Sequence, residues 1–90
     1  MQDRVAALDE WLKAHETDLM EAYRKMLRIA SVEGPAADNA PYGPENRQAL
    51  DYALELCEGF GFSTKDLEGH AGYGQFGSGE KLIMSLGHLD

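Results

Sequence analysis

The sequence predicts an α/β fold, because helical periodicity over its first sixty residues gives way to short strand-like segments. Apolar residues recur every three or four positions through residues 5–30 and again through 49–60, which is the spacing of one helix face. From residue 62 the glycines cluster between short runs, as in strands joined by tight turns. Two or three helices, then a hairpin and a buried strand, indicate the opening part of a layered α/β domain.

The first thirty residues are predicted to be helical, with their apolar stripe packed in the core. The pattern weakens from His15 to Thr17. This leaves two alternatives open: a second helix capped by Thr17 or Asp18, or one kinked helix. Trp11 lies beside the stripe and is expected to be half-buried.

A loop and a third helix follow. Residues 33–44 hold three prolines and two glycines, which prevent regular pairing. Pro44 occupies the first position of the next predicted helix, and Gly59 and Gly61 are predicted to end it. Cys57 lies on the apolar stripe of that helix. It has no basic neighbour to lower its pKa, so it is interpreted as a packed structural thiol.

The last thirty residues are predicted to form strands. Residues 62–65 and 70–76 form a hairpin around a turn at Glu68–Gly69. A third strand covers residues 81–86. Its Leu-Ile-Met centre is continuously apolar, which is typical of a strand covered on both faces.

Composition narrows the classes of function. The 90 residues carry 8 basic and 16 acidic side chains, a net charge of −8, which disfavours binding to nucleic acid. The longest apolar run, Val5–Leu8, is far shorter than the roughly 20 residues of a membrane span. No signal sequence follows Met1, and the single cysteine forms no internal disulfide. A cytoplasmic location is therefore expected.

A candidate site follows the predicted third strand. In an extended chain, residues two apart project to the same side, so His88 and Asp90 should point together at the carboxyl end of that strand. The carboxylate can accept Nδ1–H, which leaves Nε2 free to bind a metal. The pattern is short, and a structural histidine near a strand end is the alternative.

The other two histidines are expected to be structural. His15 lies among charged residues and is interpreted as solvated, and His70 as a surface strand residue. Neither has a second metal ligand at a useful spacing. The glycines of residues 72–79 lack the Gly-Lys-Ser/Thr ending of a phosphate-binding loop and are better explained as hairpin turns.

Six short stretches, taken in order, resemble the amino-terminal segment of the co-catalytic zinc metallopeptidases. That family includes aminoacylases, glutamate carboxypeptidases, succinyl-diaminopimelate desuccinylases and bacterial dipeptidases. The stretches are 27–32, 41–44, 49–50, 59–62, 69–73 and 86–90. The Pro-Tyr-Gly loop and the Gly-Tyr of the hairpin are most similar to the dipeptidase branch. The chain departs from the family at Ala30, where proline is common, and at Glu68, where aspartate is common. Both changes affect local structure rather than chemistry.

The resemblance implies that His88 is the first zinc ligand and that Asp90 is the catalytic-site carboxylate that orients it. It also implies a zinc-exopeptidase-like catalytic domain with an inserted lid domain. In this family two zinc ions activate a water that attacks short peptides or N-acyl amino acids. Residues 1–90 would be an incomplete amino-terminal segment without the lid and the remaining ligands. We expect this segment alone to be inactive and to hold zinc poorly.

Two hypotheses remain open on the sequence. The first is a fragment of a two-zinc metallopeptidase, with dipeptidase, desuccinylase and deacylase activities not distinguished. The second is a free-standing small acidic α/β protein-interaction module without catalysis. Its exposed strand edges would then be covered by a partner or by self-association.

Overall fold

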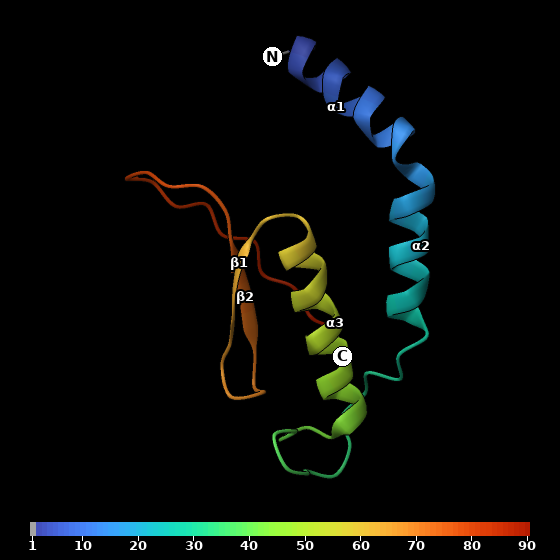
Figure 1. Ribbon diagram of the computed structural model, residues 1–90, viewed down its shortest axis with the longest axis vertical. Helices are drawn as coiled ribbons and strands as arrows, with labels where there is room; N and C mark the ends of the chain where they lie inside the picture. Colours follow the sequence, from blue (N-terminus) through green and yellow to red (C-terminus); the bar gives the residue numbers. More distant parts are fainter. Residues whose placement is uncertain (1) are drawn as a thin grey trace.

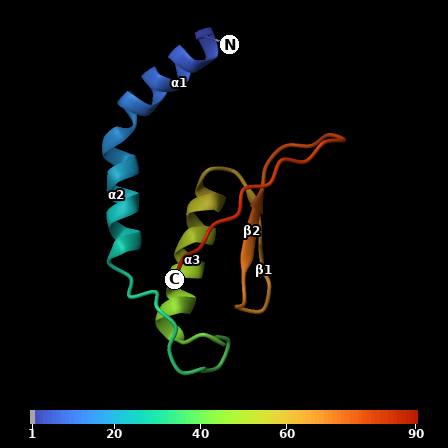
Figure 2. The same ribbon diagram turned by 180° about the vertical axis from the view of Figure 1, so that it is seen from behind.

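The computed structural model describes residues 2–90, and its helices and hairpin confirm the predicted α/β class (Figure 1). The elements in order are α1 (Gln2–Ala14), α2 (Glu16–Leu27), α3 (Pro44–Gly59), β1 (Ser63–Asp66) and β2 (Gly72–Gln75). Helices α1 and α2 form a curved arm on one side of α3, and the hairpin lies on the other side (Figure 2). Across residues 2–90, no helix has the length and apolar character that crossing a membrane requires.

The arm bends at His15, which lies between two separate helices. This confirms the first of the two alternatives, a second helix rather than one kinked helix. The predicted caps, Thr17 and Asp18, are wrong, because His15 itself precedes the first residue of α2 and makes no side-chain cap bond. Its Nδ1 instead donates to the carbonyl of Trp11 at 2.8 Å, and the two rings stack with centroids 4.1 Å apart. His15 is thereby partly buried rather than solvated.

The apolar stripe of the arm is not a core, which corrects the prediction. Neither α1 nor α2 contains a buried residue, and Leu8, Leu19 and Tyr23 are 56%, 58% and 56% exposed. Trp11, as expected, is about half exposed, at 53%. The reason is that α1 curves away from the other elements (Figure 1), and among residues 2–90 one side-chain hydrogen bond joins α2 to α3, from Tyr52 to the carbonyl of Ala22 at 3.1 Å.

The arm also explains the open shape of the molecule. The radius of gyration is 15.6 Å, whereas a compact chain of this length would have about 12 Å. The molecule measures 49 × 34 × 18 Å along its principal axes, so it is elongated and thin. Apolar surface that a compact domain would bury is therefore left in contact with solvent.

Helix α3 begins and ends where the sequence predicts. Pro44 takes a first-turn position, and Gly61 follows the last turn with a φ of +89°. The loop before it returns on itself through the paired residues Ala37 and Ala40. The buried hydrophobic side chains of residues 2–90 are small in number and centre on α3: Ala40, Ala49 and Leu50.

The hairpin packs against α3 through glycines. Its strands are antiparallel, with Ser63 opposite Gln75 and Asp66 opposite Gly72. A Cβ placed on Gly72 would lie 3.0 Å from side-chain carbons of both Leu50 and Leu54. The absence of a side chain at this position is what allows the strand to approach the helix so closely.

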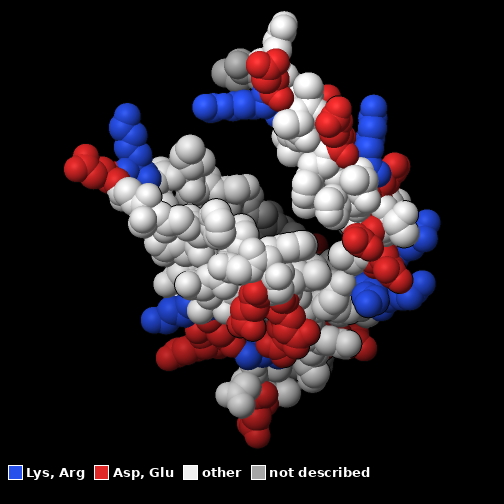
Figure 3. Space-filling model, turned by 45° about the horizontal axis from the view of Figure 1, so that its top comes forward, with Lys and Arg blue, Asp and Glu red and all other residues white. Residues whose placement is uncertain are grey.

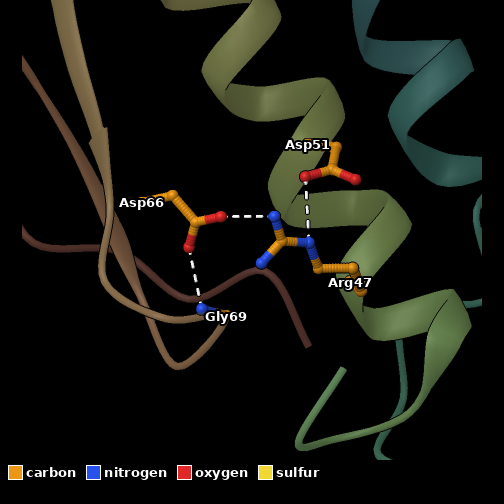
Figure 4. A network of polar contacts seen from close by, with 4 residues as sticks. All are labelled: Arg47, Asp51, Asp66 and Gly69. Atoms are coloured by element: carbon orange, nitrogen blue, oxygen red, sulfur yellow. Dashed lines mark hydrogen bonds and ion pairs between the residues drawn. The ribbon is translucent and has the colours of Figure 1, made fainter. Parts of the chain in front are cut away.

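The predicted turn at Glu68–Gly69 is confirmed and is fixed by a polar network (Figure 4). The Gly69 amide donates to one carboxylate oxygen of Asp66 at 2.8 Å, and Arg47 of α3 pairs with the other oxygen. The Nε of Arg47 lies 3.1 Å from the carboxylate of Asp51, one helical turn further along. The network ties the turn to the first half of α3.

The third strand predicted at residues 81–86 is wrong. This segment has no regular structure, and its apolar centre is exposed, with Leu82 at 75%, Ile83 at 97% and Met84 at 78%. A strand needs a neighbouring backbone to pair with, and within residues 2–90 the sheet contains only β1 and β2. After β2 the chain runs out to a tip near residues 77–80 and returns towards α3 (Figures 1 and 2).

Candidate functional site

The returning tail closes one side of a pocket of about 320 Å³. The hairpin turn and the start of α3 form the other sides. Its lining residues are Tyr42, Asn46, Leu50, residues 69–72 and residues 86–90. Three segments that are far apart in sequence therefore meet around the predicted site.

His88 and Asp90 lie on the same side of the tail and both line this pocket. The Nδ1 of His88 is 3.6 Å from a carboxylate oxygen of Asp90, which is ion-pair range but longer than a hydrogen bond. Their side chains are 88% and 61% exposed. The two groups project together from an extended, unpaired segment, whereas the sequence placed them at the tip of a buried strand. Their roles as metal ligand and orienting carboxylate stay predictions.

The residues of this pocket supply only some of the ligands that a zinc site needs. A zinc site needs three or four protein ligands, or three and a water. Among residues 2–90, no group of three His, Cys, Asp or Glu side chains is arranged to hold a metal ion. His88 can supply one nitrogen ligand through Nε2, with Asp90 beside its Nδ1, and further ligands would have to come from outside this chain.

A second polar pair in the pocket was missed by the sequence analysis. The Nδ1 of His70 lies 3.0 Å from the hydroxyl of Tyr42, and the rings meet edge to face at 5.4 Å. His70 is exposed, as predicted, but lies in the turn before β2 rather than in the strand. Tyr42 and His70 are 28 positions apart, so no local spacing in the sequence predicts their contact.

The pocket carries little charge of its own. Asp90 is its acidic residue, and within residues 2–90 no lysine or arginine lines it. The nearby Arg47 is engaged by two carboxylates, and the hydrogen bond to Asp66 raises the pKa of its guanidinium. The pKa of Asp66 is lowered, first by the Gly69 amide and then by Arg47. The imidazoles of His70 and His88 are the other titratable side chains that line the pocket.

A larger apolar groove lies elsewhere, between the arm and the end of α3. Its volume is about 380 Å³, and Leu19, Tyr23, Leu56 and Phe60 are among its lining residues. The space-filling view shows the hollow beside the arm, with uncharged surface over much of the adjoining face (Figure 3). The groove contains no residue of the predicted site.

Comparison with known proteins points to peptidases. The chain is 36% identical over 83 residues to a protein of Staphylococcus haemolyticus, and 37% identical over 78 residues to one of Staphylococcus epidermidis. It is 34% identical over 83 residues to a protein of Staphylococcus aureus strain USA300. All three are named "Putative dipeptidase".

The similarity covers most of this chain but a small part of those proteins. The matches span 84–90% of the chain and only 17–18% of the length of the relatives. No family model matches the chain, and no solved structure matches it. The comparisons therefore support a dipeptidase-like segment.

Proposed function

We propose that this chain is the amino-terminal segment of the catalytic domain of a zinc-dependent dipeptidase. The observation that carries the proposal is the 36% identity to a dipeptidase-named protein over 90% of the chain. The meeting of His88 and Asp90 in one pocket adds geometric support, because a metal-binding imidazole needs a neighbour that orients it. The substrates are short peptides or N-acyl amino acids, and the enzyme works in the cytoplasm.

In this proposal His88 binds the first of two zinc ions through Nε2, and Asp90 holds the Nδ1 side of the imidazole. The zinc ions would lower the pKa of a water so that it can attack an amide at neutral pH. His88 and Asp90 are a minority of the ligands such a centre needs. Residues 1–90 by themselves are therefore expected to hydrolyse no peptide. Turnover of a dipeptide by the isolated chain with added zinc would contradict this.

The experiment starts from the gene. The coding sequence is read past Asp90, its natural product is purified, and zinc content and dipeptide hydrolysis are measured for the wild type and for His88→Ala. We expect the variant to lose both zinc and activity. His15→Ala is the matched control, because its imidazole lies on the arm and outside the pocket. Full activity with unchanged zinc in His88→Ala would overturn the metal role.

A second candidate, a protein-interaction module that associates with itself or with a partner, is favoured by the exposed apolar surface. The groove beside the arm and the exposed segment 82–86 both present apolar side chains to solvent. Both edges of the two-stranded sheet are also available for pairing. A stop codon directly after Asp90 in the gene would favour this candidate over the peptidase.

A further inference from the structure

We propose that the apolar groove beside the arm is the docking surface for a second copy of this chain, with the two α2 helices paired in antiparallel orientation. The proposal does not depend on the peptidase activity, because the groove shares no residue with the candidate site. Its side chains are open to solvent: Leu19 and Tyr23 of α2 and Phe60 after α3 are each more than half exposed.

The arm carries the residue spacing of a helix-pairing seam. Groove-lining residues of the arm recur in alternating steps of three and four positions: Leu12, His15, Leu19, Ala22 and Met26. Side chains at this spacing form one stripe along a helix, and such a stripe packs against the stripe of a second helix. Leu12 and Leu19 are 40% and 58% exposed, so the seam is left open to a partner helix.

The charges beside the seam match a second copy. Asp18 lines the groove, and Lys25 lies seven residues later, about two turns along the same side of α2. Antiparallel helices place the start of one beside the end of the other. With Leu19 packed against Ala22 of the second copy, Asp18 of each copy lies opposite Lys25 of the other, and two ion pairs flank the seam.

The same charges disfavour a parallel pair. In that orientation Asp18 would lie opposite Tyr23 of the second copy, and Lys25 opposite Ala30, so neither charge would be matched. Asp18 and Lys25 are both exposed, and within residues 2–90 neither takes part in an ion pair. Their pairing with a second copy therefore breaks no existing contact.

The distribution of charge also favours contact through the arm. Residues 1–30 hold 5 of the 8 basic and 6 of the 16 acidic side chains, which leaves a net charge of −1 there and −7 on residues 31–90. Two copies that meet through other faces bring strongly acidic surfaces together and repel each other. Two copies that meet through their arms avoid most of this repulsion.

The test reverses each charge in the full 90-residue chain. Asp18→Lys places lysine against lysine across the interface, and Lys25→Asp places aspartate against aspartate. We expect each variant alone to raise the dissociation constant of the dimer about tenfold, because two attractive pairs become repulsive. An equimolar mixture of the two variants restores both opposite-charge pairs and should form a heterodimer about as stable as the wild-type dimer.

Sedimentation equilibrium over a concentration series gives the dissociation constants. All proteins carry Ile83→Lys, which removes association through the exposed apolar tail. Glu21→Lys is the matched control, because it makes the same change of charge sign on α2 outside the groove. It should leave the dissociation constant within about twofold of the parent value.

A double variant separates pairing from helix stability. Asp18→Lys combined with Lys25→Asp in one chain keeps opposite charges facing each other, so it should dimerise like the wild type. The same change puts a base in the first turn of α2 and an acid in the last, which opposes the helix dipole. A mere effect on helix stability therefore predicts a double variant weaker than either single one.

Five outcomes overturn the proposal. The first two concern the parent chain: a monomer at every concentration up to about 1 mM, or assemblies larger than a dimer. The others concern the variants: unchanged dimers in both single variants, no heterodimer in their mixture, or an equal loss in Glu21→Lys. A monomeric parent would show that a second copy does not cover the groove.

Discussion

Arg47 of α3 and Asp66 of β1 form an ion pair that joins the helix to the hairpin, and the Gly69 amide donates a hydrogen bond to the same carboxylate. The pair connects residues 19 positions apart. It lies beside the turn that lines the candidate site. Whatever weakens it should therefore loosen the turn as well as the helix–hairpin contact.

The first prediction concerns pH. The Gly69 amide and Arg47 lower the pKa of Asp66 below the ordinary value of an aspartate, so its folded pKa lies below its unfolded one. Such a group stabilises the fold above the unfolded pKa, and this contribution disappears as pH falls through the folded pKa. We expect the hairpin to lose stability in that acid range, measured by urea unfolding at a series of pH values.

Asp66→Asn is the control for this prediction. The amide can still accept a hydrogen bond from Gly69 but carries no charge and does not titrate. Its free energy of unfolding should be lower than that of the wild type at neutral pH, and the difference should vanish in strong acid. A difference that stays constant across the series would show that the carboxylate charge does not matter.

The second prediction concerns the small core. Leu50 is 7% exposed and contacts β2 at Gly72, so Leu50→Ala should leave a cavity between helix and hairpin. We expect a loss of about 2–3 kcal/mol in the free energy of unfolding. The matched control is Leu19→Ala, at a position 58% exposed on the arm, which should change it by less than about 0.5 kcal/mol. Similar effects at the two positions would argue against the core described above.

The third prediction concerns the close approach of β2 to α3. A Cβ at Gly72 would lie 3.0 Å from Leu50 and Leu54 and 3.1 Å from the backbone oxygen of Lys65. Gly72→Ala should therefore destabilise the fold, by about 1–2 kcal/mol. Gly59→Ala makes a useful comparison, because its added Cβ at the end of α3 would meet no atom within 4 Å beyond its chain neighbours and the backbone of its own helix. Thermal unfolding of both variants checks the prediction, which fails if Gly72→Ala is neutral.

The fourth prediction concerns the exposed tail. Ile83 is 97% exposed in an apolar stretch, so the 90-residue chain should self-associate as its concentration rises. Ile83→Lys should shift sedimentation towards the monomer. Ser85→Lys adds the same charge in the same segment without removing an apolar side chain and should have the smaller effect. A wild-type chain that sediments as a monomer at all concentrations would count against the interaction module.

The fifth prediction separates Asp90 from His88 in the natural gene product. Asp90→Asn should retain most of the zinc and lose much of the hydrolysis rate, because the amide positions the imidazole less well than the carboxylate does. Elemental analysis and a dipeptide assay give the two readouts. Loss of zinc as complete as in His88→Ala would make Asp90 a ligand rather than an orienting group.

The elements that the sequence predicted correctly are those with local causes. Pro44 starts α3 because its ring suits a first-turn position, and Gly69 turns the hairpin because its φ of +79° suits glycine. The approach of His88 to Asp90 also follows from a local rule, the alternation of side chains in an extended chain. Each of these depends on a few neighbouring residues.

The predictions that were wrong or missing depend on contacts between segments that are far apart in the sequence. The apolar pattern of residues 81–86 and of the arm indicates burial, but burial depends on surfaces that residues 2–90 do not bring to those segments. The Tyr42–His70 pair escaped notice because it depends on how the loop and the hairpin turn meet. For the polar network, the four-residue spacing of Arg47 and Asp51 was a readable signal, whereas the partnership with Asp66 was not.

The glycine tip that follows β2 has a practical consequence. Gly77 and Gly79 have φ values of +83° and +149°, and a Cβ at either would meet no atom within 4 Å. Extra residues inserted between them would extend from an exposed tip into solvent. A fluorophore or an affinity peptide placed there would report on this molecule in a cell extract while sparing both the helix and the pocket.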